Sequence, residues 1–155
     1  MYRKIVICLD GSDLAEQVIP FAAELAQRFS SELVLIRVVP DPVIVTPGIT
    51  GAPGAPVITS RMGRQVESEE RQSDAYLRSV ADRLLQQYGL HAECVTSLGV
   101  AGQTIVEYAA ANQVDLIAIA THGRTGPGRV LFGSVADYVL RQSRLPVLLI
   151  RPITK

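Results

Sequence analysis

The chain has 155 residues, of which 48% are hydrophobic, and this is enough to build one domain with a substantial core. Acidic and basic residues balance at 15 each, so no overall field would draw the protein onto nucleic acid or an anionic membrane. We therefore expect a single domain over residues 1–155 that binds its ligand through a local site and contacts neither nucleic acid nor membrane.

The cysteines and the N-terminal segment indicate the cytoplasm. Cys8 and Cys94 lie far apart without a C-x-x-C pair or nearby histidines, so we interpret them as buried, reduced thiols. The apolar run from residue 5 to residue 9 ends at Asp10, which makes it too short for a signal peptide or a membrane span. We predict a cytoplasmic protein.

The first third of the chain predicts two buried strands joined by a helix. The runs 5–9 and 33–39 are almost continuously apolar, as in strands covered on both faces. Asp13 and Glu16 are placed as a possible cap pair, and Pro20 predicts a kink inside one helix at a cost of about 3 kcal/mol. The expected apolar face of this helix has the helical spacing of three and four: Leu14, Val18, Phe21, Leu25 and Phe29.

A Pro- and Gly-rich segment over residues 40–63 predicts a long connection, either a linker or a lid over a ligand. A second helix is expected next, ended by Gly89 and followed by a strand over 92–97. The apolar face of that helix contains Tyr76, Leu77, Val80, Leu84 and Tyr88.

The last third alternates in the same way. A third helix is marked by Ile105, Val106, Ala109 and Ala110, and the strand 116–120 and a Gly-rich loop follow it. A last helix holds Val135, Val139 and Leu140, and Pro146 and Pro152 bracket a closing strand over 147–150. Strands that alternate with helices predict a doubly wound parallel α/β sheet with right-handed crossovers and helices on both faces.

Ligands of such sheets bind beyond the carboxyl ends of the strands, where the winding reverses. Asp10 follows the first strand and could accept hydrogen bonds from ribose hydroxyls, or simply form a local Asp-Gly turn. Gly123 permits close approach to an anion, and Gly133 with Ser134 opens the last helix, where unpaired N–H groups favour phosphate. The alternative is that the glycines are plain turns and that Ser134 only caps its helix.

Other nucleotide and catalytic motifs are absent. The chain has no G-x-x-x-x-G-K-[ST] and no G-x-G-x-x-G after the first strand, which excludes a Walker ATPase and a Rossmann dehydrogenase. A Ser-His-acid set cannot be assembled at the strand ends, because His91 and His122 are the only histidines. His122 and Arg124 could meet phosphate or be ordinary loop residues, so we assign no catalytic residue and no protein metal ligand.

The loop after the fourth predicted strand is similar to a known family signature. Gly123, nine residues and then Gly133-Ser134 resemble the signature of the universal stress protein family, G-x-x-G-x9-G-[ST], and Ala120 replaces its first glycine. The resemblance extends over the whole chain, including residues 4–12, 33–39 and 146–150.

The resemblance implies the family's ATP-binding branch, a Rossmann-like, adenine nucleotide alpha hydrolase-like sheet of five strands in the order 3-2-1-4-5. It implies ATP, ADP or AMP between the first and fourth strands, with Mg²⁺ held through the phosphates, and a homodimer formed by the last strand, Val147 to Ile150. The residues then expected to line or hold the nucleotide are Leu9, Asp10, Val38, Ile119, Ala120, His122, Gly123, Arg124, Gly133, Ser134, Val135 and Ala136.

Three functions remain open on these residues. The first is a dimeric regulatory or stress-response module that binds an adenine nucleotide. The second is a slow ATPase or an autophosphorylating protein, for which no base is evident. The third is a dimeric partner-binding module without nucleotide, which Ala120 alone favours, because its methyl group narrows the approach to the ribose.

Overall fold

The computed structural model describes residues 1–41, 60–121 and 133–153. Its elements alternate along the chain as the sequence predicts. They are β1 (Lys4–Cys8), α1 (Asp13–Glu16), α2 (Ile19–Phe29), β2 (Glu32–Val39), α3 (Ser60–Tyr88), β3 (Ala92–Leu98), α4 (Ala101–Ala111), β4 (Leu116–Ala120), α5 (Ser134–Gln142) and β5 (Val147–Ile150).

The strands form one five-stranded parallel sheet in the order β3-β2-β1-β4-β5. Strand β1 pairs with β2 on one side, where Ile7 lies opposite Leu35, and with β4 on the other, where Ile7 lies opposite Ala118. The chain winds outward from β1 through β2 to β3 and then crosses to β4. The winding therefore reverses between β1 and β4, which confirms the predicted fold and strand order.

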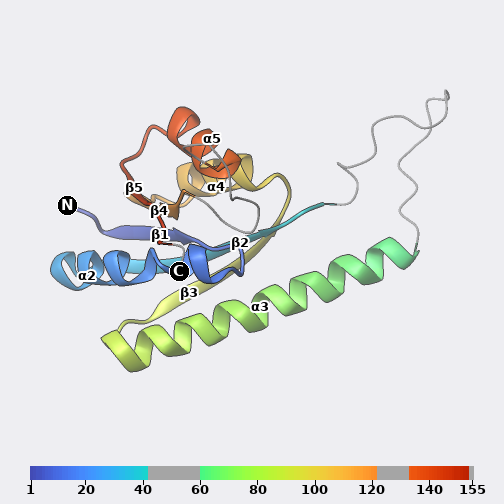
Figure 1. The fold of residues 1–155 in the computed structure, drawn as a ribbon, viewed down its shortest axis with the longest axis horizontal. Coiled ribbons are helices and arrows are strands. Elements are labelled where there is room, and N and C mark those ends of the chain that lie inside the picture. The colour runs from blue at the N-terminus through green and yellow to red at the C-terminus, as the bar shows by residue number, and fades with distance from the viewer. Residues whose placement is uncertain (42–59, 122–132, 154–155) are drawn as a thin grey trace.

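Helices cover both faces of the sheet (Figure 1). Helices α1, α2 and α3 pack on one face, whose buried side chains include Ile5, Leu35 and Leu77. Helices α4 and α5 pack on the other face against Val6 and Ile117. Because successive side chains of a strand point to opposite faces, a continuous apolar run supplies both cores at once.

The predicted single helix after β1 is two helices, and the expectation of a kink at Pro20 was wrong. Helix α1 ends at Glu16, α2 begins at Ile19, and Pro20 lies in the first turn of α2. A first-turn residue has no intrahelical partner for its N–H, so proline removes no hydrogen bond there. The predicted Asp13–Glu16 cap was also wrong, because Ser12 caps α1 and accepts the N–H of Ala15.

The predicted apolar face of α2 was only partly correct. Val18 is buried, but Phe21 and Phe29 are 51% and 39% exposed. The fully buried positions of this helix are the alanines Ala22, Ala23 and Ala26. Small side chains allow the helix to lie close to the sheet, and the large ones are left at its side.

Helix α3 is longer than the sequence indicates. It begins at Ser60, so the end of the predicted 40–63 connection is helical, whereas residues 42–59 lie outside the described residues. Its C-terminus matches the prediction, since Gly89 has a φ of +67° and donates its N–H to Leu85. Among the described residues, no helix is long and apolar enough to cross a membrane.

Candidate functional site

A cavity opens at the carboxyl ends of the central strands, at the point where the winding reverses. The ends of β1, β2 and β4 contribute to its walls, and the first turns of α4 and α5 complete them. Most of the wall is apolar. Its residues are Cys8, Leu9, Asp10, Ala15, Ile36, Val38, Ala101, Ile105, Ile119, Ala120, Thr121, Gly133, Ser134, Val135 and Ala136.

The structure brings together every predicted site residue that it describes. Leu9 and Asp10 follow β1, Val38 lies near the end of β2, and Ala120 ends β4. Ile119 and residues 133–136 also line the cavity, whereas the predicted residues His122, Gly123 and Arg124 lie outside the described residues. Residues that are more than a hundred positions apart therefore share one cavity.

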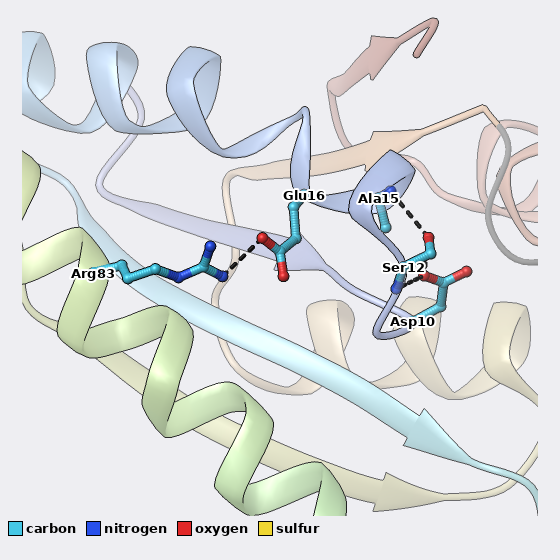
Figure 2. Close-up of polar contacts among 5 residues, drawn as sticks. All are labelled: Asp10, Ser12, Ala15, Glu16 and Arg83. Carbon is cyan, nitrogen blue, oxygen red and sulfur yellow. Dashed lines mark hydrogen bonds and ion pairs between the residues drawn. The ribbon is translucent and has the colours of Figure 1, made fainter. Parts of the chain in front are cut away.

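Asp10 is held by a short network within its own loop (Figure 2). Its Oδ1 accepts the backbone N–H of Ser12 at 2.9 Å and the Ser12 hydroxyl at 2.6 Å. The oxygen of Ser12 in turn accepts the N–H of Ala15 at 3.1 Å, which caps α1. The predicted Asp-Gly turn is thus present, and it fixes a carboxylate at the cavity wall.

Two uncapped helix N-termini border the cavity. Helix α5 begins at Ser134 after the N-cap residue Gly133, and α4 begins at Ala101 after Val100; neither cap residue supplies a side-chain hydrogen bond. Ser134 is therefore the first residue of its helix rather than its cap. The partial positive charge at each of these helix ends favours an anion.

Backbone hydrogen bonds fix the start of α5 to the end of β4. Gly133 donates its N–H to the carbonyl oxygen of Thr121, and Thr121 donates its own N–H to Ile150 at 2.8 Å. Thr121 is 4% exposed. The helix end that borders the cavity is therefore held by the central sheet.

Part of the cavity wall was missed by sequence reasoning. Ile36 could have been found, because it lies two residues from Val38 and so on the same face of β2. Ala101 and Ile105 come from α4, and only the crossover of this helix brings them to the cavity. Cys8 also lines the wall, where burial raises the pKa of its thiol to about 12 and keeps it neutral.

The sequence profile of the universal stress protein family matches residues 1–151. The chain belongs to this family. Universal stress protein MJ0531 of Methanocaldococcus jannaschii is 32% identical over 152 residues, which cover 97% of this chain and 83% of that one.

Solved structures of universal stress proteins have the same fold. The structure of UspA from Lactobacillus plantarum is 25% identical in sequence and has a TM-score of 0.81. The match covers 97% of this chain and 98% of the UspA chain. The structure of the Archaeoglobus fulgidus universal stress protein in complex with dAMP is 20% identical in sequence and has a TM-score of 0.63. The match covers 97% of this chain and 98% of that protein's chain.

Proposed function

We propose that this universal stress protein binds an adenine nucleotide in the cavity between β1 and β4 and acts as a dimeric regulatory module. The observation that carries the proposal is the pairing of an apolar cleft with two uncapped helix N-termini. Such a site suits a ligand that is apolar and planar at one end and anionic at the other. The dAMP complex of the Archaeoglobus fulgidus relative is consistent with such a ligand.

The described residues divide between the two ends of the nucleotide. Ile36, Val38 and Ile105 would enclose the base, with backbone groups of Val38 reading its edge. The carboxylate of Asp10, which Ser12 holds in place, would accept hydrogen bonds from the ribose hydroxyls. The first turn of α5, which begins at Ser134, would receive the phosphates through its backbone N–H groups.

A magnesium ion would be held through the phosphates of ATP rather than by a protein cluster. Among the described residues, no group of three histidine, cysteine or carboxylate side chains is placed to hold a metal ion. Mg²⁺ keeps several of its waters and is commonly bound by phosphates with one or two carboxylates, and Asp10 is the carboxylate on the cavity wall.

We assign a regulatory role rather than turnover, in the cytoplasm. Asp10 is the one acidic or basic side chain among the described lining residues, and its Oδ1 already accepts two hydrogen bonds from Ser12. A slow ATPase would need a group that positions water. Cys8 is buried as predicted, whereas Cys94 is only partly buried; both thiols are free, which suits a reducing compartment.

The partner in the proposed dimer is a second copy of the chain, joined through β5. Within the part of the chain that the structure describes, this strand lies at the edge of the sheet and pairs with β4 alone, and its four residues are half-buried. An apolar edge with unpaired backbone groups is a template for another strand. Antiparallel pairing of Val147–Ile150 with its copy would extend the sheet across both subunits.

A nucleotide-free, partner-binding dimer is the second candidate, and Ala120 favours it. This residue is 7% exposed and lines the cavity where the family signature has its first glycine. One methyl group is the smallest side chain that could intrude there, so we rank this alternative second.

Calorimetric titration with ATP and Mg²⁺ tests the proposal. The parent protein should bind in the micromolar range, and Gly133→Val should weaken binding at least about tenfold, or about 1.4 kcal/mol, by blocking phosphate approach. Gly63→Val is the matched control, because a β carbon at Gly63 would meet no atom within 4 Å and Gly63 does not line the cavity. Absence of binding by the folded parent would favour the nucleotide-free alternative.

A further inference from the structure

The guanidinium of Arg37 lies flat against the loop that carries Asp10. Arg37 is on β2 between the cavity-lining residues Ile36 and Val38, so its side chain projects from the opposite face of the sheet. A β carbon built on Gly11 would stand 3.2 Å from Cζ of Arg37, 3.3 Å from Nη2 and 3.4 Å from Nη1. These nearly equal distances mean that the plane of the guanidinium faces the position that a β carbon on Gly11 would take.

The same guanidinium contacts helix α3 through Tyr76. Cζ of Arg37 lies 5.3 Å from the centroid of the Tyr76 ring, within the range of a cation–π interaction. The Tyr76 hydroxyl is buried and has no hydrogen-bond partner among the described residues. Burial, then the adjacent carboxylate of Glu16 and the charge of Asp10, raise the pKa of Tyr76, so the phenol stays neutral and its hydroxyl lies near Glu16 without a hydrogen bond of normal geometry to it. The contact with Arg37 is made by the ring of Tyr76.

A second contact joins the same segment to α3. Arg83 of α3 forms an ion pair of 2.7 Å with Glu16 of α1, and Figure 2 shows it reaching across from its helix. The Glu16 side chain is only 19% exposed, which reduces screening by solvent. Helix α3 thus reaches the segment from Asp10 to Glu16 at two points. It reaches Glu16 directly through Arg83, and it reaches Gly11 indirectly, through the contact of Tyr76 with Arg37 of β2.

We infer that Arg37 and Tyr76 are positioning residues, through which α3 fixes the Asp10–Glu16 segment from the face of the sheet opposite the cavity. Leu9, Asp10 and Ala15 line the cavity, so a shift of this segment changes the cavity wall. The consequence is that the placement of α3 is coupled to the affinity for adenine nucleotide. This consequence rests on the proposed function. Coupling of this kind is reciprocal, so bound nucleotide would also stabilise the contact of α3 with the sheet.

Substitutions at both positions test the contact. Arg37→Met removes the guanidinium and keeps most of the aliphatic stem, and Tyr76→Leu removes the ring and keeps an apolar side chain. Tyr76→Phe removes the hydroxyl but keeps the ring against Arg37, so it should retain the exchange rates and the affinity of the parent. The matched controls are Tyr88→Leu, also on α3 and packed on the same core, and Arg28→Met at an exposed i,i+4 ion pair.

Two readouts are needed, one of which does not depend on nucleotide. Hydrogen exchange of residues 9–17 in the nucleotide-free protein reports the loop directly, through bonds such as Glu16 N–H to Ser12. Calorimetry with ATP and Mg²⁺ reports the affinity. Arg37→Met and Tyr76→Leu should each exchange faster over residues 9–17 and bind about two- to fivefold more weakly. The double variant should bind nucleotide no more weakly than the weaker-binding single variant, because both substitutions remove the same contact.

The outcomes separate the two proposals. If the parent binds nucleotide but both variants match it in affinity and exchange, the inference is overturned and the proposed function stands. If Tyr88→Leu has the same effects as Tyr76→Leu, general packing of α3 explains them and the inference is again overturned. If the parent binds no nucleotide, the proposed function fails. Faster exchange in Arg37→Met and Tyr76→Leu alone would then still support the positioning role, and unchanged exchange would overturn it.

Discussion

The hydroxyl of Ser12 donates a 2.6 Å hydrogen bond to Asp10 while its oxygen accepts the N–H of Ala15, so one side chain orients the carboxylate and caps α1. Ser12→Ala should therefore lower the free energy of unfolding by about 1 kcal/mol through the lost cap. It should also weaken nucleotide binding, because the Asp10 carboxylate loses the hydrogen bond from the Ser12 hydroxyl that orients it.

Ser12→Thr keeps the hydroxyl and should retain both properties. Chemical denaturation and calorimetry measure the two effects, with Ser79→Ala on the exposed side of α3 as the control. Unchanged stability and affinity in Ser12→Ala would contradict this role.

Gly102 marks the close approach of α4 and α5. A β carbon there would lie 2.8 Å from Cδ1 of Tyr138 and 2.9 Å from its Cβ and Cγ. Gly102→Ala should destabilise the protein by about 1–3 kcal/mol despite the higher helix propensity of alanine. In a Tyr138→Ala background the same change should cost much less.

Gly63→Ala is the converse case, and denaturant unfolding measures the stability change of both variants. Gly63 lies in α3, and a β carbon there would meet no atom within 4 Å. The change should stabilise the protein by about 0.4–1 kcal/mol, because alanine loses less conformational entropy on folding. If Gly102→Ala were stabilising to the same extent, the tight contact with Tyr138 would be refuted.

Asp115 should make stability depend on acid pH. Its Oδ2 accepts the N–H of Arg3 at 2.8 Å and of Lys4 at 3.0 Å, and these bonds hold the pKa of the carboxyl below its ordinary value of 3.8. The folded protein therefore binds fewer protons than the unfolded chain in this range, so the contribution of Asp115 is complete above the ordinary value and is lost as pH falls through the lowered one.

Thermal unfolding of the parent and of Asp115→Asn should reveal this dependence. The parent should have the higher Tm at neutral pH, and the difference should shrink below the ordinary pKa. Asp82→Asn on the exposed side of α3 is the control. A difference that stays constant down to strongly acid pH would argue against the charged hydrogen bonds.

Pro20→Ala tests the break between α1 and α2. Proline in the first turn removes no intrahelical hydrogen bond, so replacing it should change the free energy of unfolding by less than about 1 kcal/mol. A gain near 3 kcal/mol, measured by denaturant unfolding, would instead mean that Pro20 interrupts one continuous helix.

The strands could be predicted closely because burial on both faces requires continuous apolar runs. Strands β4 and β5 have the bounds predicted from 116–120 and 147–150. The side faces of α2 could not be predicted, since the spacing of Phe21, Leu25 and Phe29 defines one stripe of a helix without indicating what covers it. The structure places Ala22 and Ala26 against the sheet instead.

The first turns of α3 carry little sequence signal for a buried helix. Polar residues dominate there, and i,i+4 contacts such as Gln65–Glu69 and Arg71–Glu67 line the helix. The cavity was predictable where strand ends supply it, as at Asp10. Ala101 could not be predicted, because its position depends on how α4 crosses back over the sheet.

Titration of isotope-labelled protein with ATP and Mg²⁺, followed by amide NMR, tests the central claim most directly. Saturable shifts should be largest at Leu9, Asp10, Val38, Ser134 and Val135, which line the cavity. Shifts confined to residues outside the cavity, or none at millimolar nucleotide, would contradict nucleotide binding between β1 and β4.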